Sequence, residues 1–398
     1  MVSQWQQRIT QLVHYLGSYR SLWHESVFNQ PQPLWLQQHP QLADWLLALP
    51  EQQVIEYDLN QAALITDASV YLNDLYDLAK LSQFDLVEVA LPKPINPRQF
   101  AHIPGRKLEQ IQSFVAALPP YDGKLLEWCS GKGHLGRLFA QQHGNSVVSL
   151  EYDKALCDSG TELAARAQLP QRFICQDALA TEAADVVQSR QRAVALHACG
   201  DLHRQLLHHG VNNKTEQLAI SPCCYHLTTE ELYQPLSNLA LELSLPLDRS
   251  HLRLAVLQTK TAPERVRRLR ATEVSYRLGF KRLLASINVL QQPLPSCGKA
   301  IFSQGFESFC RWACAELRIE LNTTPCWDEL ELQGQADWQR QRRLDLARQL
   351  FRPALESYLV LDRALYLAEN GYQVSISRFC QDQITPRNIL IFAKRHSE

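Results

Sequence analysis

The sequence predicts an α/β protein with a doubly wound, Rossmann-like sheet. Short apolar segments alternate with helical segments from residue 105 to residue 226, a pattern typical of a mostly parallel sheet with helices on its faces. The first apolar segment leads into a glycine turn, Gly131-Lys132-Gly133, and the next one ends on an acid, Glu151. This arrangement is typical of a β-α-β unit that binds a nucleotide.

Five strands are expected in the repeating part and two at the end of the chain. The first expected strand begins at Leu125. The other six expected strands span residues 146–151, 171–177, 192–201, 216–226, 371–380 and 388–395. Helices are expected at 105–118, 153–167, 181–188 and 202–209. The last two apolar segments, separated by a turn with Pro386, predict an antiparallel pair that completes the sheet.

Helical patterns flank the repeating part on both sides. Apolar residues such as Leu72, Leu75 and Leu78 recur with a period of about 3.6 residues, as on one face of a helix. We therefore expect four segments. They are a helical N-terminal region (1–104), a nucleotide-binding core (105–258), a helical insertion that contacts substrate (259–366) and a terminal strand pair (367–398).

The composition excludes several classes of protein. The chain has 398 residues, of which 45% are hydrophobic and 20% charged, and a net charge of −1, as in an ordinary globular protein. Because the net charge is close to zero, any nucleic-acid contact needs a local basic patch. No apolar segment has the length of a membrane span or the position of a secretory signal. We expect a cytoplasmic protein without membrane contact, and no feature indicates a stable protein partner.

The glycine turn alone fits two cofactors, because Gly131 to Gly136 also matches the GxGxxG pattern of NAD-binding units. Glu127 precedes the turn, where a carboxylate attracts the ammonium group of S-adenosylmethionine (SAM) and repels the pyrophosphate of NAD. We therefore expect SAM, with Glu151 accepting from its ribose and Asp177 from its adenine, although Asp177 also fits a helix cap. The expected cofactor-binding residues are Glu127, Cys129, Gly131, Lys132, Gly133, Leu135, Glu151, Asp177 and Ala178.

Polar residues also follow the fourth and fifth expected strands, at the edge of the sheet where ligands bind. His197, Asp201 and His226 are candidate catalytic residues, because each can take a proton from a nucleophile that attacks the methyl group of SAM. Asp201 is equally well explained as a helix cap, and both histidines as structural residues. The candidate substrate contacts in this region are Cys223, Cys224 and Tyr225.

The cysteines near this edge raise the question of a metal. The chain has 11 cysteines without the spacing of a disulfide framework. Thiolate and imidazole ligands suit zinc, but no paired C-x2-C spacing is present, and the adjacent Cys223 and Cys224 make simultaneous ligation awkward. We therefore expect small side chains packed beside the cofactor, and no metal. The group comprises Cys129, Cys199, Cys223, Cys224, His197 and His226.

One tract of the chain is strongly basic. Eight lysines and arginines lie between Lys260 and Arg282, against two glutamates, and a second run contains Arg340, Arg342 and Arg343. Such runs are most often solvated helix faces, but RNA phosphates also dock on them. RNA is therefore a candidate partner. The candidate contacts are Arg267 and Arg268.

Four motifs, in the same order, resemble a group of SAM-dependent methyltransferases. They are GKGHL at 131–135, HACGDL at 197–202, CCYHL at 223–227, and LDRALYLAENG with TPRN at 361–371 and 385–388. The group includes methyltransferase-like proteins labelled "ribosomal RNA adenine dimethylase domain-containing". It is related to the tRNA ribose 2′-O-methyltransferases with a CCHH element and to a glutathione S-transferase C-terminal domain-containing protein. The resemblance covers about residues 105–230 and 350–396, and it implies a Rossmann-like methyltransferase that uses SAM.

The chain also departs from this group. Cys129 stands where the cofactor loop usually has glycine, and Arg387 in the TPRN motif is implied to bind substrate or to pair with Asp362. The fourth strand lacks the N/D-P-P-Y/F motif with which adenine-N6 methyltransferases hold the amino group, which argues against adenine dimethylation. No lysine follows this strand to act as the base of ribose methylation, so a histidine would serve.

The leading hypothesis is a SAM-dependent methyltransferase that acts on RNA, either tRNA or rRNA. The alternatives are a methyltransferase for proteins or small molecules, a SAM-binding or RNA-binding scaffold without turnover, and an NAD-linked oxidoreductase. A scaffold would keep its function without His197, Asp201 or His226, and would lose it without Gly131 or Glu151.

Overall fold

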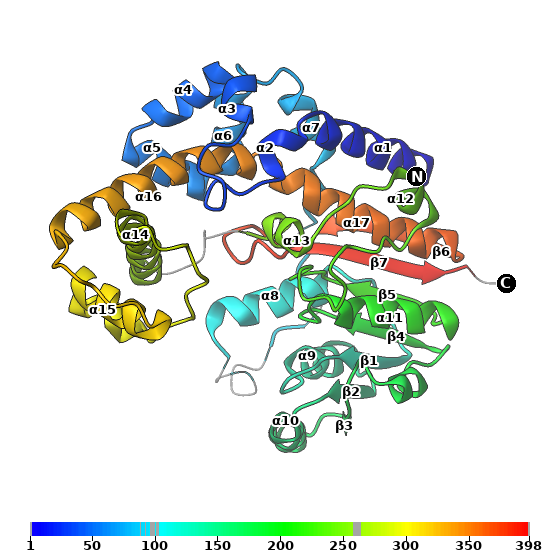
Figure 1. Cartoon of the computed structure of the whole chain (residues 1–398). Coiled ribbons are helices and arrows are strands. Elements are labelled where there is room, and N and C mark those ends of the chain that lie inside the picture. The colour runs from blue at the N-terminus through cyan, green and yellow to red at the C-terminus, as the bar shows by residue number, and fades with distance from the viewer. Residues whose placement is uncertain are drawn as a thin grey trace. The chain divides into compact units, whose positions relative to one another are not determined.

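The computed structural model describes residues 2–87, 89–91, 93–95, 100, 103–257 and 264–396 (Figure 1). The chain forms two compact units, each built from separate stretches of sequence. Unit 1 comprises residues 1–19, 74–258 and 351–398, and unit 2 comprises residues 20–73 and 259–350. The predicted N-terminal region (1–104) and the predicted insertion (259–366) therefore each contribute to both units.

Unit 1 contains a seven-stranded sheet with the order β3-β2-β1-β4-β5-β7-β6. The first five strands along the chain pair in parallel, whereas β7 pairs antiparallel with both β5 and β6. This arrangement confirms the predicted doubly wound sheet with a terminal antiparallel pair. The strands are β1 (Lys124–Trp128), β2 (Val147–Glu151), β3 (Gln171–Cys175), β4 (Gln191–Ala195), β5 (Gln217–Ile220), β6 (Tyr372–Arg378) and β7 (Ile389–Arg395).

Alternate residues of each central strand enter two separate cores, as the period of two in a strand requires. Leu126 and Ala193 pack with residues of α11 (Asp201–Asn212) and α17 (Arg352–Glu369) on one face. Leu125 and Val194 pack with residues of α8 (Gly105–Ala116) and α9 (His134–His143) on the other. Both faces of the sheet are therefore covered by helices, and α10 (Lys154–Ala167) packs against β3.

The helix α17 is the most deeply buried helix of unit 1. Fourteen of its residues are buried, because it packs against β6 on one side and α1 (Val2–Ser18) on the other, as Figure 1 shows. The expected helix at 181–188 is instead a 3-10 helix, η2 (Thr181–Val186), which has no side-chain cap and ends at Val187 in extended backbone. The other helices of unit 1 are α7 (Leu75–Leu81), α12 (Asn238–Leu243) and α13 (Arg249–Ala255).

Unit 2 is entirely helical in its described residues. Its longest helices, α14 (Glu264–Ser286) and α16 (Trp327–Gln349), pack along each other, and an aromatic core with Tyr276, Phe302 and Phe309 lies beside them. The remaining elements are α2 (Arg20–Trp23), α3 (Trp35–Gln38), α4 (Pro40–Ala48), α5 (Glu51–Leu59), α6 (Gln61–Ala68), η3 (Lys299–Gln304) and α15 (Phe306–Leu317). Within the described part of the chain, no helix has the length and apolar character of a membrane-spanning segment.

Candidate functional site

The strand order places the site between β1 and β4. The chain winds from β1 through β2 to β3 on one side, and then returns to β4 on the other side of β1. At such a reversal the loops that follow the two strands separate and leave room for a ligand at their carboxyl ends. The loops after β1 and β2 form the cofactor half of this edge, and those after β4 and β5 form the cysteine half.

The cofactor half is organised around Glu151 at the end of β2. Its Oε2 atom accepts a hydrogen bond of 2.7 Å from the backbone N–H of Gly131, and Oε1 accepts one of 3.0 Å from the N–H of Asp153. These bonds hold the carboxylate directly beside the glycine turn. Each oxygen still has a lone pair for a hydroxyl donor, so the predicted ribose contact is geometrically open.

The two glycines of the turn have different roles. Gly131 has a φ of +57°, and a Cβ at this position would meet nothing within 4 Å. The space beside Gly131 is therefore open to a ligand. Gly133 has a φ of +66°, but its Cβ would lie 2.3 Å from Gln171 Nε2 and 2.5 Å from Phe173 Cζ. Packing against β3 and the positive φ both account for glycine at position 133, and its predicted contact with a cofactor stays a prediction.

Glu127 lies beneath the turn. Only 3% of its surface is exposed, and its Oε2 accepts hydrogen bonds from Ser149 Oγ at 2.7 Å and Gln171 Nε2 at 3.3 Å. Burial raises the pKa of Glu127 to about 7, although hydrogen bonds from Ser149 and from the backbone of Gly136 and Leu135 oppose this. These contacts support an anchoring role at the start of α9, and its contact with the ammonium group of SAM stays a prediction.

The other predicted cofactor residues line or support the same turn. Cys129 has a left-handed backbone with a φ of +56°, a conformation that glycine adopts more readily than other residues. Burial, together with the nearby Glu151, Cys199 and Asp177, raises the pKa of the Cys129 thiol to about 12. Asp177 is exposed and accepts a hydrogen bond from Leu179 N. Lys132 is exposed, whereas Leu135 and Ala178 belong to the cores.

The cysteine half is joined by backbone contacts between the loops after β4 and β5. Cys199 and Cys223 form a parallel β-bridge, and Gly200 N donates a hydrogen bond of 3.2 Å to Cys223 O. Asp201 N donates to Leu227 O at 3.0 Å. Gly200 has a φ of +57°, and a Cβ there would lie 1.8 Å from Leu227 O. The loops can therefore approach this closely only with glycine at position 200.

Asp201 has structural partners in this region. Its Oδ2 accepts hydrogen bonds from Thr229 N at 2.8 Å and Thr229 Oγ1 at 3.3 Å, and its Oδ1 lies 3.7 Å from Arg204 Nε. These contacts link the start of α11 to the loop after β5. They support a positioning role for Asp201, and its predicted catalytic role stays a prediction.

Desolvation favours the neutral form of both candidate histidines. His197 is exposed, and partial desolvation lowers its pKa, with a smaller contribution from the positive charge of Lys107. Desolvation also lowers the pKa of His226, and Arg253 and Arg387 add to the effect. A neutral imidazole can accept a proton. His197 is therefore the better candidate base, because it is the more accessible of the two.

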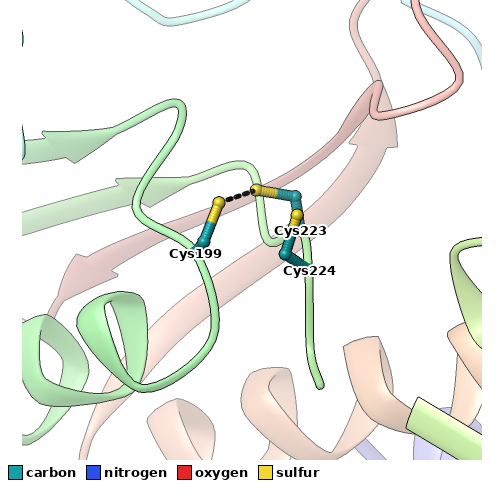
Figure 2. A group of neighbouring side chains, drawn as sticks. All are labelled: Cys199, Cys223 and Cys224. Carbon is teal, nitrogen blue, oxygen red and sulfur yellow. Dashed lines mark hydrogen bonds between the residues drawn. The ribbon is translucent and has the colours of Figure 1, made fainter. Parts of the chain in front are cut away.

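Three cysteines meet at the centre of this half (Figure 2). The sulfur atoms of Cys199, Cys223 and Cys224 all lie within 4.8 Å of one another, and those of Cys199 and Cys223 are 3.4 Å apart. The backbone of Cys224 is left-handed, with a φ of 44°, so the adjacent side chains of Cys223 and Cys224 both reach Cys199. Both adjacent sulfurs therefore lie close to the third, and the expectation that adjacency makes simultaneous ligation of one metal awkward stays a prediction.

A buried network of hydrogen bonds and aromatic contacts packs against the CCYH segment (residues 223–226). Arg363 donates hydrogen bonds to His203 Nε2 at 2.8 Å and to Tyr233 Oη at 3.1 Å, and its guanidinium lies 4.8 Å from the ring centre of Tyr225. Tyr225 is only 3% exposed, so these contacts favour a structural role over its predicted substrate contact. Arg363 and His203 could not be assigned to this site from the sequence, because only the fold brings α17 and α11 to this loop.

Arg387 lies near the cysteines. Within the described residues it forms no ion pair with Asp362, which has other partners. Asp362 accepts hydrogen bonds from Tyr233, from the backbone of Leu236 and from both Ser237 N and Ser237 Oγ. One nitrogen of Arg387 donates to Val256 O, and the other terminal nitrogen is buried without a partner among the described residues. The implied ion pair with Asp362 is therefore not formed, and substrate contact stays a prediction.

The basic tract lies in unit 2, and its residues differ in exposure and in their ion-pair partners. Arg267 is half-buried and Arg268 is exposed on α14, where Arg268 pairs with Glu264. Arg282 pairs with Asp337 at 2.6 Å. Lys260 lies outside the described residues. The second run is structural, because Arg340, Arg342 and Arg343 bind the backbone or acids of residues 31–58 within the same unit.

Comparison with known proteins identifies the core of unit 1. Residues 106–231 match a family described as a methyltransferase domain. This span contains β1 to β5, both glycines of the turn and the cysteine half of the site. Residues 106–231 therefore resemble a methyltransferase domain, and the seven-stranded sheet around them is Rossmann-like, as the sequence predicted. No curated protein matches the chain.

Solved structures that resemble the chain share only part of it. A TehB-like SAM-dependent methyltransferase from Corynebacterium glutamicum is 16% identical over 31% of this chain and 66% of its own, with a TM-score of 0.24. Geranyl diphosphate C-methyltransferase from Streptomyces coelicolor is 15% identical over 37% and 63%, with a TM-score of 0.27. TrmN from Thermus thermophilus is 18% identical over 32% and 42%, with a TM-score of 0.26.

Proposed function

We propose that the protein is a SAM-dependent methyltransferase that modifies RNA. The observation that carries the first part is the glycine turn held against the Glu151 carboxylate, within a domain that matches methyltransferases. The RNA substrate is the finer part of the proposal. It is supported by the charges around the site, described below.

The residues of the cofactor half fit SAM. The open space beside Gly131 admits the cofactor close to the backbone, Glu151 would accept its ribose hydroxyls, and Asp177 is exposed and near enough to the turn to accept from its adenine. SAM supplies a methyl group on a positively charged sulfur, which is a good leaving group. The methyl transfer therefore mainly requires the protein to align the substrate with the methyl group of SAM.

The cysteine half would provide the base. A bond forms between the substrate nucleophile and the methyl carbon while the bond from that carbon to sulfur breaks, with the electron pair remaining on sulfur as S-adenosylhomocysteine forms. The nucleophile loses a proton, and His197 is neutral and exposed at the end of β4, where it can accept it.

Positive charge surrounds this half and favours an anionic substrate. Lys107 acts on His197, whereas Arg253 and Arg387 act on His226, and in each case the cation lowers the pKa of the imidazole. Such charges attract a phosphate backbone although the whole chain is near neutral. Lys107 lies in α8, before β1, so no local sequence pattern predicts that it lies near His197.

The test measures transfer of labelled methyl groups from SAM to RNA, protein and small-molecule fractions of cells that lack the gene. We expect label in RNA, and a fall of about 100-fold or more in kcat for His197→Ala with unchanged SAM affinity, as for loss of a general base. Label confined to protein or small molecules would overturn the RNA part. SAM binding without any transfer would favour the scaffold alternative.

Lys107→Ala tests the charge argument separately, with Lys154→Ala as the matched control. Lys154 is an exposed lysine that pairs with Asp158 on α10. We expect Lys107→Ala to raise the KM for RNA and to reduce its dependence on salt, because one phosphate contact is lost. Equal KM values for both variants would remove the support that Lys107 gives to an RNA substrate.

A further inference from the structure

The three cysteines of the cysteine half have the arrangement of a metal site. In a tetrahedral zinc site with Zn–S bonds of about 2.3 Å, neighbouring sulfur atoms lie about 3.8 Å apart. Here one sulfur pair is separated by 3.4 Å and no pair by more than 4.8 Å. Small adjustments of the side chains would therefore bring all three sulfurs to coordinating positions around one ion.

The backbone already fixes these positions. The β-bridge between Cys199 and Cys223, together with the hydrogen bond from Gly200 N to Cys223 O, holds the loops after β4 and β5 in register. The left-handed residue Cys224 then turns the second adjacent thiol toward the other two. Ligation of one ion by the three sulfurs would therefore need movement of the side chains only.

The surroundings suit a site of three thiolates. Arg387 lies close enough to interact electrostatically with Cys199 and Cys224, and a cation there offsets the surplus negative charge of three thiolates around Zn²⁺. His226 interacts with Cys224, and its Nδ1 is buried without a hydrogen-bond partner among the described residues. Imidazole nitrogens complete many tetrahedral zinc sites, but no nitrogen of His226 lies within 4.8 Å of all three sulfurs, so the three cysteines alone define the proposed site.

We propose that Cys199, Cys223 and Cys224 bind one Zn²⁺ ion, which ties the loop after β4 to the loop after β5. Thiolate ligands favour zinc over magnesium or calcium. His197 and His226 each lie two residues from a proposed ligand, Cys199 and Cys224 respectively. The ion would therefore hold both histidines at one edge of the sheet. This proposal does not depend on methyl transfer, because it concerns a site defined by its own ligands.

The test uses the full chain, purified without chelators and kept reduced so that no disulfide competes for the thiols. Zinc content is measured by mass spectrometry of the metal. After removal of zinc, Co²⁺ is added, since tetrahedral cobalt thiolate sites have intense charge-transfer bands. We expect one metal per chain and these cobalt bands in the wild-type protein.

Single serine variants of the three cysteines identify the ligands. We expect each to weaken zinc binding by at least about 100-fold, because loss of even an outer partner of a metal site costs about 10- to 100-fold. Cys175→Ser is the matched control, since Cys175 is an exposed free cysteine on β3 of the same unit. It should bind zinc like the wild type.

Two results would overturn the proposal. One is a reduced, folded wild-type chain, with a normal circular dichroism spectrum, that binds neither zinc nor cobalt. The other is zinc affinity that is equal in the three serine variants and in Cys175→Ser. Metal binding and methyl transfer are measured separately, so failure of one proposal is distinguishable from failure of the other.

Discussion

The two halves of the site differ in how their residues are held. In the cofactor half, neighbouring segments of one β-α-β unit make the contacts, and Gly131 and Glu151 are only 20 residues apart. In the cysteine half, residues from β4, β5 and α17 meet, and Arg363 reaches His203 across 160 residues. The cofactor half is therefore a local structure, whereas the cysteine half depends on the assembled sheet.

The comparison also separates two kinds of chemistry. The cofactor half uses backbone groups and a carboxylate, which suit a ligand with hydroxyl donors. The cysteine half uses thiols and imidazoles, which can hold a soft metal or a proton. Four changes test this division, from the largest expected effect to the smallest.

Gly200→Ala should cost the most. The new Cβ would lie 1.8 Å from Leu227 O, and the backbone has a φ of +57°, so the loops after β4 and β5 must separate or the chain must unfold. We expect a loss of about 4 kcal/mol or more in the free energy of unfolding, measured with urea.

The control for this change is Gly105→Ala at the start of α8, where a Cβ meets nothing within 4 Å. It should alter the free energy of unfolding by less than about 1 kcal/mol. If both variants were equally stable, the close contact between the loops could not be what organises the cysteine half.

Glu127→Gln should change the pH dependence of stability. The folded pKa of Glu127 is raised from 4.5 to about 7, so the folded chain holds this proton more tightly than the unfolded chain. Protonated Glu127 therefore contributes up to about 3 kcal/mol to the free energy of unfolding below pH 4.5. This contribution is lost as the pH rises through about 7. We expect the variant to gain stability relative to the wild type between pH 5 and pH 8 in urea unfolding.

Glu162→Gln provides the comparison, because Glu162 is an exposed acid paired with Arg166 on α10. Its stability should run parallel to that of the wild type across the same pH range. A parallel curve for Glu127→Gln as well would mean that Glu127 is not a buried anchor of the glycine turn.

Glu151→Ala should abolish one strong cofactor contact without unfolding the protein. Charged hydrogen bonds of this kind contribute about 1.5–3 kcal/mol, so SAM affinity should fall by about 10- to 100-fold in calorimetric titration. Glu162→Ala on α10 should bind SAM like the wild type. Undiminished affinity in Glu151→Ala would contradict the assignment of the cofactor half.

Cys129→Gly should have the smallest effect, and it should be favourable. Cys129 adopts a φ of +56°, which costs a residue with a Cβ about 1–2 kcal/mol relative to glycine. Cys129→Ala keeps the Cβ and removes the sulfur, so it is the matched variant. We expect the glycine variant to be about 1 kcal/mol more stable than the alanine variant in urea unfolding, and equal stability would show that the backbone is not strained there.

Much of the fold could be predicted because its signals are local. The alternation of apolar and helical segments predicted all five parallel strands and the terminal pair. The predicted glycine turn also forms, with Gly131 N bonded to Glu151. The strands β4 and β5 end earlier than expected, at Ala195 and Ile220. Apolar residues continue into the site loops there, so hydrophobicity alone could not mark the ends.

The grouping of distant segments could not be predicted in this way. Residues 20–73 share a unit with residues 259–350, and Arg342 of the second stretch pairs with Glu51 and Asp58 of the first. In the sequence these arginines looked like a free basic run. Whether a surface charge is paired depends on which helix packs beside it, and helical periodicity carries no information about that partner.

The sequence by itself determined the class of the protein, because a strand, a glycine turn and an acid within about 25 residues can fold in few ways. The tertiary structure alone decided how the cysteines and histidines are used. Cys199 and Cys223 are 24 residues apart in the chain and 3.4 Å apart between sulfurs, because parallel strands β4 and β5 end side by side. The left-handed turn at Cys224 then brings the third thiol to the same point, and no pattern of residue types encodes that angle.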